Sequence, residues 1–315
     1  MSLLNTNLAA VNDGSKLYLY YQNNAQIFEA SSPDSGSTWQ LDSQPIADHC
    51  DPGGSALTAY YIQHDGFFDD KSTIHVIYID ADHNLNERVK SLSDAKWTMI
   101  PFPDTLKQHS PNPDSKLCSG VCHDSAPGGH QWLFFTIEDQ TGNYEVAELR
   151  RGSSSKEDWA FNKVLPDKPG QALLGAYMAC NITDPYNYLI FQDYGGQIEE
   201  YTGTDEKWID QKILTITTES KTPLAACSSD TEGKPHLFFV DANKPPQIQD
   251  YVDGSPLVPL VPFYPGSTLG TTRMDKKIFL FYREVKNPYQ IVTYIYDGSK
   301  WIPGAAVGLG LQGTG

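Results

Sequence analysis

A pattern of strand signals repeats six times along this 315-residue chain, and it constrains the fold more than any other feature. Each repeat contains a run of aromatic and β-branched residues that is typical of a buried β-strand. These runs begin at Leu17, Ile74, Gln131, Tyr188, His236 and Phe279. A self-similar unit of about 45 to 60 residues indicates a repeat architecture, in which each unit packs against its neighbours.

The other features of the repeat keep a fixed order around each aromatic run. A strand of small residues precedes the run, as at 118–122 or 224–227, and a hairpin and then a strand that opens with tryptophan follow it. The tryptophans are Trp39, Trp97, Trp159, Trp208 and Trp301, and the fifth repeat has Ser255-Pro256-Leu257 in their place. Small side chains are needed where strands from several units crowd around one axis. The pattern predicts an all-β fold, a six-bladed β-propeller with four antiparallel strands per blade, as one domain over residues 1–315.

The charge balance excludes several classes of function. Asp and Glu number 39 against 23 Lys and Arg, which gives a net charge of −16 at pH 7. This sign is wrong for a protein that follows a phosphate backbone, so we expect no nucleic-acid partner. No apolar stretch is long enough for a membrane span. The opening residues 1–5 lack the basic and apolar regions of a secretory leader, so we expect no leader in this chain. The Asn181-Ile182-Thr183 glycosylation triplet leaves the compartment open between a secretory route and others.

Cysteine and histidine give no sign of a metal or a disulfide framework. The five cysteines are too few to staple a chain of this length, and four of them lie on the small-residue strands, where a thiol acts as a small hydrophobic side chain. Their pairing stays open. The eight histidines show no metal-ligand spacing, so we expect neither a metal nor a cofactor.

The order of features resembles that of the fungal fucose-binding lectins over essentially the whole chain. This resemblance implies a sugar pocket between adjacent blades, built from an arginine of the aromatic strand, a glutamate of the hairpin's second strand and a flanking aromatic ring. The charged groups hold sugar hydroxyls while the ring covers the apolar face of the sugar. The matching acid positions of this chain are Glu29, Glu87, Glu148, Glu200 and Asp250, with Thr293 in the sixth repeat.

Arginine stands at none of the six matching positions on the aromatic strands. Those positions hold Tyr18, His75, Trp132, Tyr188, His236 and Phe279. Such side chains favour a flat, largely apolar ligand, and without the guanidinium we expect no fucose affinity tighter than millimolar. In this respect the chain resembles the hetero-Diels-Alderases of tropolone-sesquiterpene biosynthesis, which join a tropolone quinone methide to a humulene-type olefin.

This second resemblance implies a cofactor-free pericyclase that takes hydrophobic small molecules. The candidate catalytic residues are Tyr18, His75, Tyr188 and His236, because a hydroxyl or an imidazole can donate a hydrogen bond or a proton to the quinone methide oxygen. The candidate substrate-binding residues are Trp132, Phe279, Glu29, Glu87, Glu148 and Glu200. We expect one dominant aromatic pocket, since the six positions differ from blade to blade.

Two alternatives stay open. The first is a lectin for a glycan other than fucose, which would use the glutamates together with an arginine supplied by another strand. The only arginines are Arg88, Arg150, Arg151, Arg273 and Arg283. The second is a structural propeller that mediates protein contacts, for which we expect exposed apolar patches and no pocket.

Overall fold

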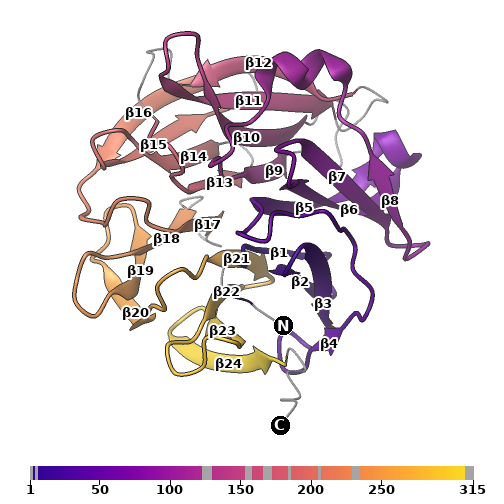
Figure 1. Ribbon diagram of the computed structural model, residues 1–315. Helices are drawn as coiled ribbons and strands as arrows, with labels where there is room; N and C mark the ends of the chain where they lie inside the picture. The colour runs from indigo at the N-terminus through magenta and orange to yellow at the C-terminus, as the bar shows by residue number, and fades with distance from the viewer. Residues whose placement is uncertain are drawn as a thin grey trace.

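The structure is a computed structural model that describes residues 3, 6–122, 130–152, 158–165, 172–183, 186–204, 207–228 and 235–308. Its strands form six antiparallel sheets of four strands each. The sheets surround one axis as the blades of a propeller (Figure 1). The predicted six-bladed β-propeller is therefore confirmed. Two short 3-10 helices, η1 (Gly66–Phe68) and η2 (Asp104–His109), lie in connections.

Each blade consists of four strands that are consecutive in the sequence, and their order in the sheet runs from the axis to the outside. Blade 1 contains β1 (Leu8–Asn12), β2 (Leu17–Asn23), β3 (Gln26–Ser32) and β4 (Gln40–Leu41). Blade 2 contains β5 (Leu57–Asp65), β6 (Lys71–Ile79), β7 (Leu85–Ser91) and β8 (Trp97–Ile100). Blade 3 contains β9 (Cys118–Cys122), β10 (His130–Glu138), β11 (Tyr144–Gly152) and β12 (Ala160–Leu165). Blade 4 contains β13 (Met178–Ile182), β14 (Asn187–Gln192), β15 (Ile198–Gly203) and β16 (Trp208–Leu214). Blade 5 contains β17 (Leu224–Ser228), β18 (Pro235–Val240), β19 (Gln247–Val252) and β20 (Val258–Pro262). Blade 6 contains β21 (Gly270–Met274), β22 (Lys277–Arg283), β23 (Ile291–Tyr296) and β24 (Trp301–Val307).

The aromatic runs form the second strand of every blade. These strands are buried almost throughout because a neighbouring blade covers each face of the sheet, which is why they read as continuous apolar runs. The five tryptophans of the repeat begin the fourth strand or directly precede it. In blade 5 this strand starts at Val258, directly after the Ser255-Pro256-Leu257 stretch. The repeat therefore located every blade.

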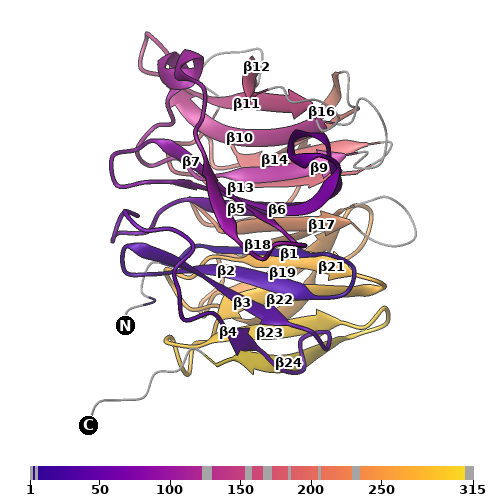
Figure 2. The same ribbon diagram turned by 90° about the vertical axis from the view of Figure 1, so that its right-hand side faces the viewer.

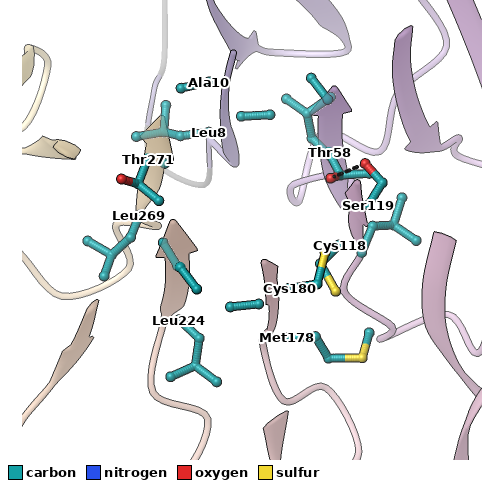
Figure 3. Close-up of a pocket in the computed structure, with 18 residues that line it drawn as sticks. Leu8, Ala10, Thr58, Cys118, Ser119, Met178, Cys180, Leu224, Leu269 and Thr271 are labelled. Carbon is teal, nitrogen blue, oxygen red and sulfur yellow. Dashed lines mark hydrogen bonds between the residues drawn. The ribbon is translucent and has the colours of Figure 1, made fainter. Parts of the chain in front are cut away.

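The innermost strands enclose a narrow channel along the axis. Their small side chains leave a cavity of about 110 Å³, which Figure 3 shows between strands of all six blades. Thr58 and Ser119 are hydrogen-bonded across it, with 2.8 Å between their hydroxyl oxygens. Four of the five cysteines lie on these strands as predicted, and all five are free thiols. The side chain of Asn181 is also buried here, so the folded blade does not present it for glycosylation.

In four of the six blades, a recurring hydrogen bond links the innermost strand to the end of the second strand. A buried Ser or Thr near the start of the inner strand accepts from a backbone N–H at that end. The pairs are Thr6 with Gln22 (2.8 Å), Ser115 with Thr136 (2.8 Å), Thr222 with Val240 (3.0 Å) and Ser267 with Arg283 (3.0 Å). These hydroxyls replace a ladder bond where the inner strand begins.

Blades 1 and 6 close the ring without exchanging a strand. The two sheets lie side by side in both views (Figure 1 and Figure 2). The Asn12 side chain donates across this seam to the Thr272 hydroxyl at 2.9 Å and to the Arg273 carbonyl at 2.6 Å. Most of the seam is an apolar cluster that contains Leu17 and Phe281. Within the described ranges, no helix is long and apolar enough to cross a bilayer.

Candidate binding sites between the blades

The predicted acids and the predicted aromatic-strand residues share one face of each blade, the face that is turned toward the next blade. In blade 2 the pairing places Ile77 opposite Glu87, so His75 lies diagonally beside that glutamate. In blade 5 Phe238 stands opposite Asp250, which places His236 in the same relation to its acid. The sequence alignment therefore brought together residues that meet at the blade interfaces.

The opposite wall of each interface comes from the next blade, and at three interfaces the tryptophan of that blade binds the acid. The indole N–H groups of Trp159, Trp208 and Trp301 donate to Glu87 (3.1 Å), Glu148 (2.7 Å) and Asp250 (3.1 Å), respectively. The tryptophans were used in the sequence only to find the repeat. Their role as donors was missed because it depends on which blade faces which.

Two interfaces also receive a cation from the next blade. Lys90 and Arg151 each lie three residues after the acid of their own blade, on the third strand. Side chains alternate along a strand, so an offset of three places them on the face turned toward the preceding blade. The lectin resemblance implied this cation on the aromatic strand, and the lectin alternative allowed an arginine from another strand, with Arg151 among the candidates. An acid followed three residues later by a base was the signal that could have found it.

At the interface of blades 1 and 2, the cation fills the site. The Lys90 ammonium is 2.7 Å from Oε1 of Glu29, and both side chains are largely buried. It also lies over the rings of Tyr18 and Trp97, at 4.9 and 5.0 Å from their centroids. The Tyr18 hydroxyl donates to Asp13 instead of Glu29, and Tyr20, which the sequence reasoning passed over, donates to Glu29 at 3.0 Å.

The interface of blades 2 and 3 is closed. His75 lies between two carboxylates, with Nδ1 2.7 Å from Glu87 Oε1 and Nε2 2.8 Å from Asp65 Oδ2. Arg151 donates to both oxygens of Glu87, at 3.0 and 2.8 Å. The side chains of all four residues have no exposed surface. His75 and Glu87, two of the predicted site residues, are thus out of reach of a ligand in this structure.

The charges of this cluster balance one another. Burial alone would raise the pKa of Glu87, but Arg151 and His75 overcome it and lower this pKa to about 2. Burial alone would lower the pKa of His75, but the carboxylates of Asp65 and Glu87 raise it above its ordinary value. The cluster therefore places two carboxylates beside an arginine and a histidine whose protonated form they favour.

The interface of blades 3 and 4 uses an arginine from its own acid strand. Arg150 contacts Glu148 through Nε and lies over the ring of Trp132, 5.2 Å from its centroid. Asn162 donates to the same carboxylate oxygen at 2.7 Å. Trp132 and Glu148 are fully buried, so this predicted pair is also internal.

The interface of blades 4 and 5 is a surface cluster of charges. Lys212 bridges Glu200 at 2.9 Å and Asp253 at 3.1 Å. Burial raises the pKa of Glu200, although Lys212 opposes the change. Tyr188 is half-buried beside this acid, whose charge contributes to raising the pKa of Tyr188. Between blades 6 and 1, in contrast, Phe279 is fully buried in an apolar cluster, and no acid among the described residues forms part of that cluster.

The interface of blades 5 and 6 holds a cavity of about 420 Å³. At its polar end, Nδ1 of His236 lies 2.9 Å from Asp250, which also accepts from Trp301. His236 lines the cavity, and its Nε2 makes no hydrogen bond with any described residue, so this nitrogen is available to a ligand. Tyr294 and Tyr296 complete an aromatic wall, with Tyr294 stacked on Trp301 at 5.6 Å.

The remaining walls of this cavity are mostly apolar. They include Val252, Val258 and Leu260 of blade 5, and Lys300 from the β23–β24 hairpin adds one cation. A carboxylate with its histidine, an aromatic wall and an apolar side can orient a ligand that has one polar edge. Within the described residues, no group of three or more His, Cys, Asp or Glu side chains could hold a metal ion.

Comparison with known proteins shows that the fold is similar to that of fucose-specific lectins. No protein-family model matches the chain, and no curated protein matches it. Among solved structures, a lectin from Aleuria aurantia in complex with a fucosylated sugar matches with a TM-score of 0.74 and 16% identity over 97% of this chain and 96% of that chain. The SapL1 lectin in complex with α-methyl fucoside has a TM-score of 0.73 and 16% identity, over 98% of this chain and 99% of that chain. AofleA from Arthrobotrys oligospora has a TM-score of 0.71 and 15% identity, over 96% and 88%. The chain has the fold of these lectins.

Proposed function

We propose that this protein is a lectin of altered specificity, which binds a glycan other than fucose in the cavity between blades 5 and 6. The observation that carries the proposal is the open pairing of His236 with Asp250 beside the aromatic wall. Asp250 accepts hydrogen bonds from ring hydroxyls, and His236 Nε2 or Lys300 donates to them. The ring of Trp301 or Tyr296 covers the apolar face of the sugar.

The other interfaces support one dominant site. Lys90 and Arg151 fill two of them from within the protein, so side chains occupy the places where a sugar would be gripped. Phe279 fills another with apolar surface. The fucose-binding neighbours support sugar binding at blade interfaces in general, and the absence of an arginine beside Asp250 supports a change in the sugar.

Glycan-array screening of the full chain, followed by calorimetry on the best ligand, tests this proposal. We expect Asp250→Asn to weaken binding at least tenfold through loss of the charged acceptor, about 1.4 kcal/mol or more. Glu200→Gln is the matched control, because it neutralises the equivalent acid of blade 4, and it should bind as the wild type does. A silent array, or equal binding by the Asp250 variant, would refute the proposal.

A second candidate function uses the same cavity for hetero-Diels-Alder chemistry. The apolar side formed by Val252, Val258 and Leu260 favours it, because a terpene-like olefin could be buried there while His236 donates to a quinone methide oxygen. Holding both reactants in an attack geometry removes much of the entropic barrier, so no covalent nucleophile is required. Incubation with tropolone and humulene-type substrates tests it. We expect His236→Phe to slow product formation about 100-fold, and unchanged rate and stereochemistry would exclude this candidate.

A further inference from the structure

In five blades, a residue one or two positions before the innermost strand lies at a mouth of the central channel. These residues, Asn7, Ala56, Lys116, Tyr177 and Thr268, line a small cavity together with apolar side chains of the inner strands. The volume open to solvent is about 40 Å³. Since one water needs about 10 to 15 Å³ by the same measure, this cavity has room for one small ion and not for a sugar.

Lys116 is the charged member of this ring. Its ammonium lies 5.4 Å from the ring centroid of Tyr177, and burial lowers the pKa of Lys116 below its ordinary value. No carboxylate among the described residues lies within ion-pair distance of it, and Asp114 and Asp51 act on it only from farther away. A desolvated ammonium without a counter-ion is costly, so this position is suited to an anion from solution.

The surroundings of the cavity strengthen the positive field. Lys221 is close enough to Lys116 to contribute to lowering its pKa. Arg283 is buried on the same side of the channel, stacked 4.9 Å from the Tyr264 ring, and its charge acts on Tyr177. This concentration of cations contrasts with the net charge of −16.

The donors of the cavity are also partly available. The Asn7 amide donates to the Ser55 carbonyl and the Thr268 hydroxyl donates to the Thr6 carbonyl. The Tyr177 hydroxyl makes no hydrogen bond with a described residue, so it is an available donor on the ring that the Lys116 ammonium overlies. An ammonium and a phenol on one small cavity form a complementary pair for two oxygens of one anion.

We propose that this channel mouth binds a small oxyanion, of the size and charge of a phosphate group, between Lys116 and Tyr177. The oxyanion supplies the counter-charge that the protein does not, and it accepts the two available donors. The site is separate from the blade interfaces and does not depend on the sugar-binding proposal.

Calorimetric titration with inorganic phosphate at constant ionic strength, with sodium chloride as the reference salt, tests this site. We expect one phosphate per chain, at least tenfold weaker binding in Lys116→Met, and weaker binding in Tyr177→Phe. Lys207→Met is the control, because Lys207 is an exposed lysine away from the channel and its loss should leave binding unchanged. Absence of phosphate binding by the wild type, or equal binding by a folded Lys116→Met variant, overturns the proposal.

A second measurement keeps the test decisive if the Lys116→Met variant fails to fold. Crystals of the wild type soaked in selenate should show an anomalous peak between the Lys116 ammonium and the Tyr177 hydroxyl. Peaks only at other places would overturn the proposal. Lys116→Arg retains the charge, and we expect it to keep binding within about tenfold of the wild type.

Discussion

Replacing Arg151 with methionine should destabilise the protein by about 3 to 5 kcal/mol, the usual cost of removing one partner from a buried ion pair. Although burial opposes it, Arg151 and His75 together lower the pKa of Glu87 to about 2 from an ordinary 4.5. At about 1.4 kcal/mol per pKa unit, the charged carboxylate is stabilised by about 3 kcal/mol, and Arg151 and His75 share this amount. Methionine retains much of the volume but leaves two carboxylates beside a single histidine.

The pH dependence gives the sharper test. Because the pKa of Glu87 is lowered by folding, its contribution is present above pH 4.5 and is lost as the pH falls toward 2. Because the pKa of His75 is raised by folding, its contribution is present below pH 6.5 and is lost as the pH rises through the folded value. The cluster is therefore most stabilising between pH 4.5 and 6.5. In Arg151→Met the deficit should be full in this window and should shrink toward pH about 3, where Glu87 can take up a proton.

Urea denaturation of both proteins across this pH range measures the effect. Lys71→Met is the matched control, because it removes an exposed ion pair with Asp94, and it should cost less than about 1 kcal/mol. A loss below about 1 kcal/mol in Arg151→Met, or a loss that stays constant down to pH about 3, would refute the reasoning.

Three further outcomes follow from the structure. Calorimetry with fucose should give no dissociation constant tighter than millimolar, and a micromolar value would contradict the argument from the missing arginine. Gly120→Ala should lower the free energy of unfolding, measured by thermal denaturation, by about 1 to 3 kcal/mol, because the added Cβ would lie 2.6 Å from Cγ1 of Ile182. Gly308→Ala is the control: its added Cβ meets nothing within 4 Å, so the stability should not change. Burial raises the pKa of both Cys50 and Cys227 to about 12. Neither thiol should therefore react with a disulfide reagent at pH about 8 until the chain is denatured. Labelling of either thiol in the native protein would show that it is accessible to the reagent.

Most of the fold could be predicted from the sequence because every blade of a propeller repeats the same local pattern of residues. Each aromatic run, small-residue strand and tryptophan has a structural reason that recurs in every blade, so six weak signals supported one another. The same alignment found the acids and the residues beside them, such as His236 with Asp250. These relations lie within one blade and follow from strand pairing.

The half of each site that comes from the next blade could be predicted only in part. The spacing of an acid and a base three residues apart places Arg151 on the face of blade 3 that is turned toward blade 2. That spacing does not identify Glu87 as its partner, because the contact depends on how the two sheets face each other. The same limit applies to burial, which separates the closed environment of His75 from the open one of His236 although both hold the equivalent position on the second strand of their blades. Distinguishing them requires the position of every neighbouring side chain.

The seam between blades 1 and 6 should differ in temperature dependence from the interfaces beside it. Within the described residues, its apolar cluster of Leu17, Phe279 and Phe281 is accompanied by the Asn12 hydrogen bonds and by no ion pair. The interfaces of blades 1 and 2 and of blades 2 and 3 add the ion pairs of Lys90 and Arg151 to apolar clusters of their own. Hydrophobic stabilisation weakens on cooling. The ring should therefore loosen first at this seam in the cold, and amide hydrogen exchange near 0 °C should rise in β1 and β21 before it rises in β5 and β9.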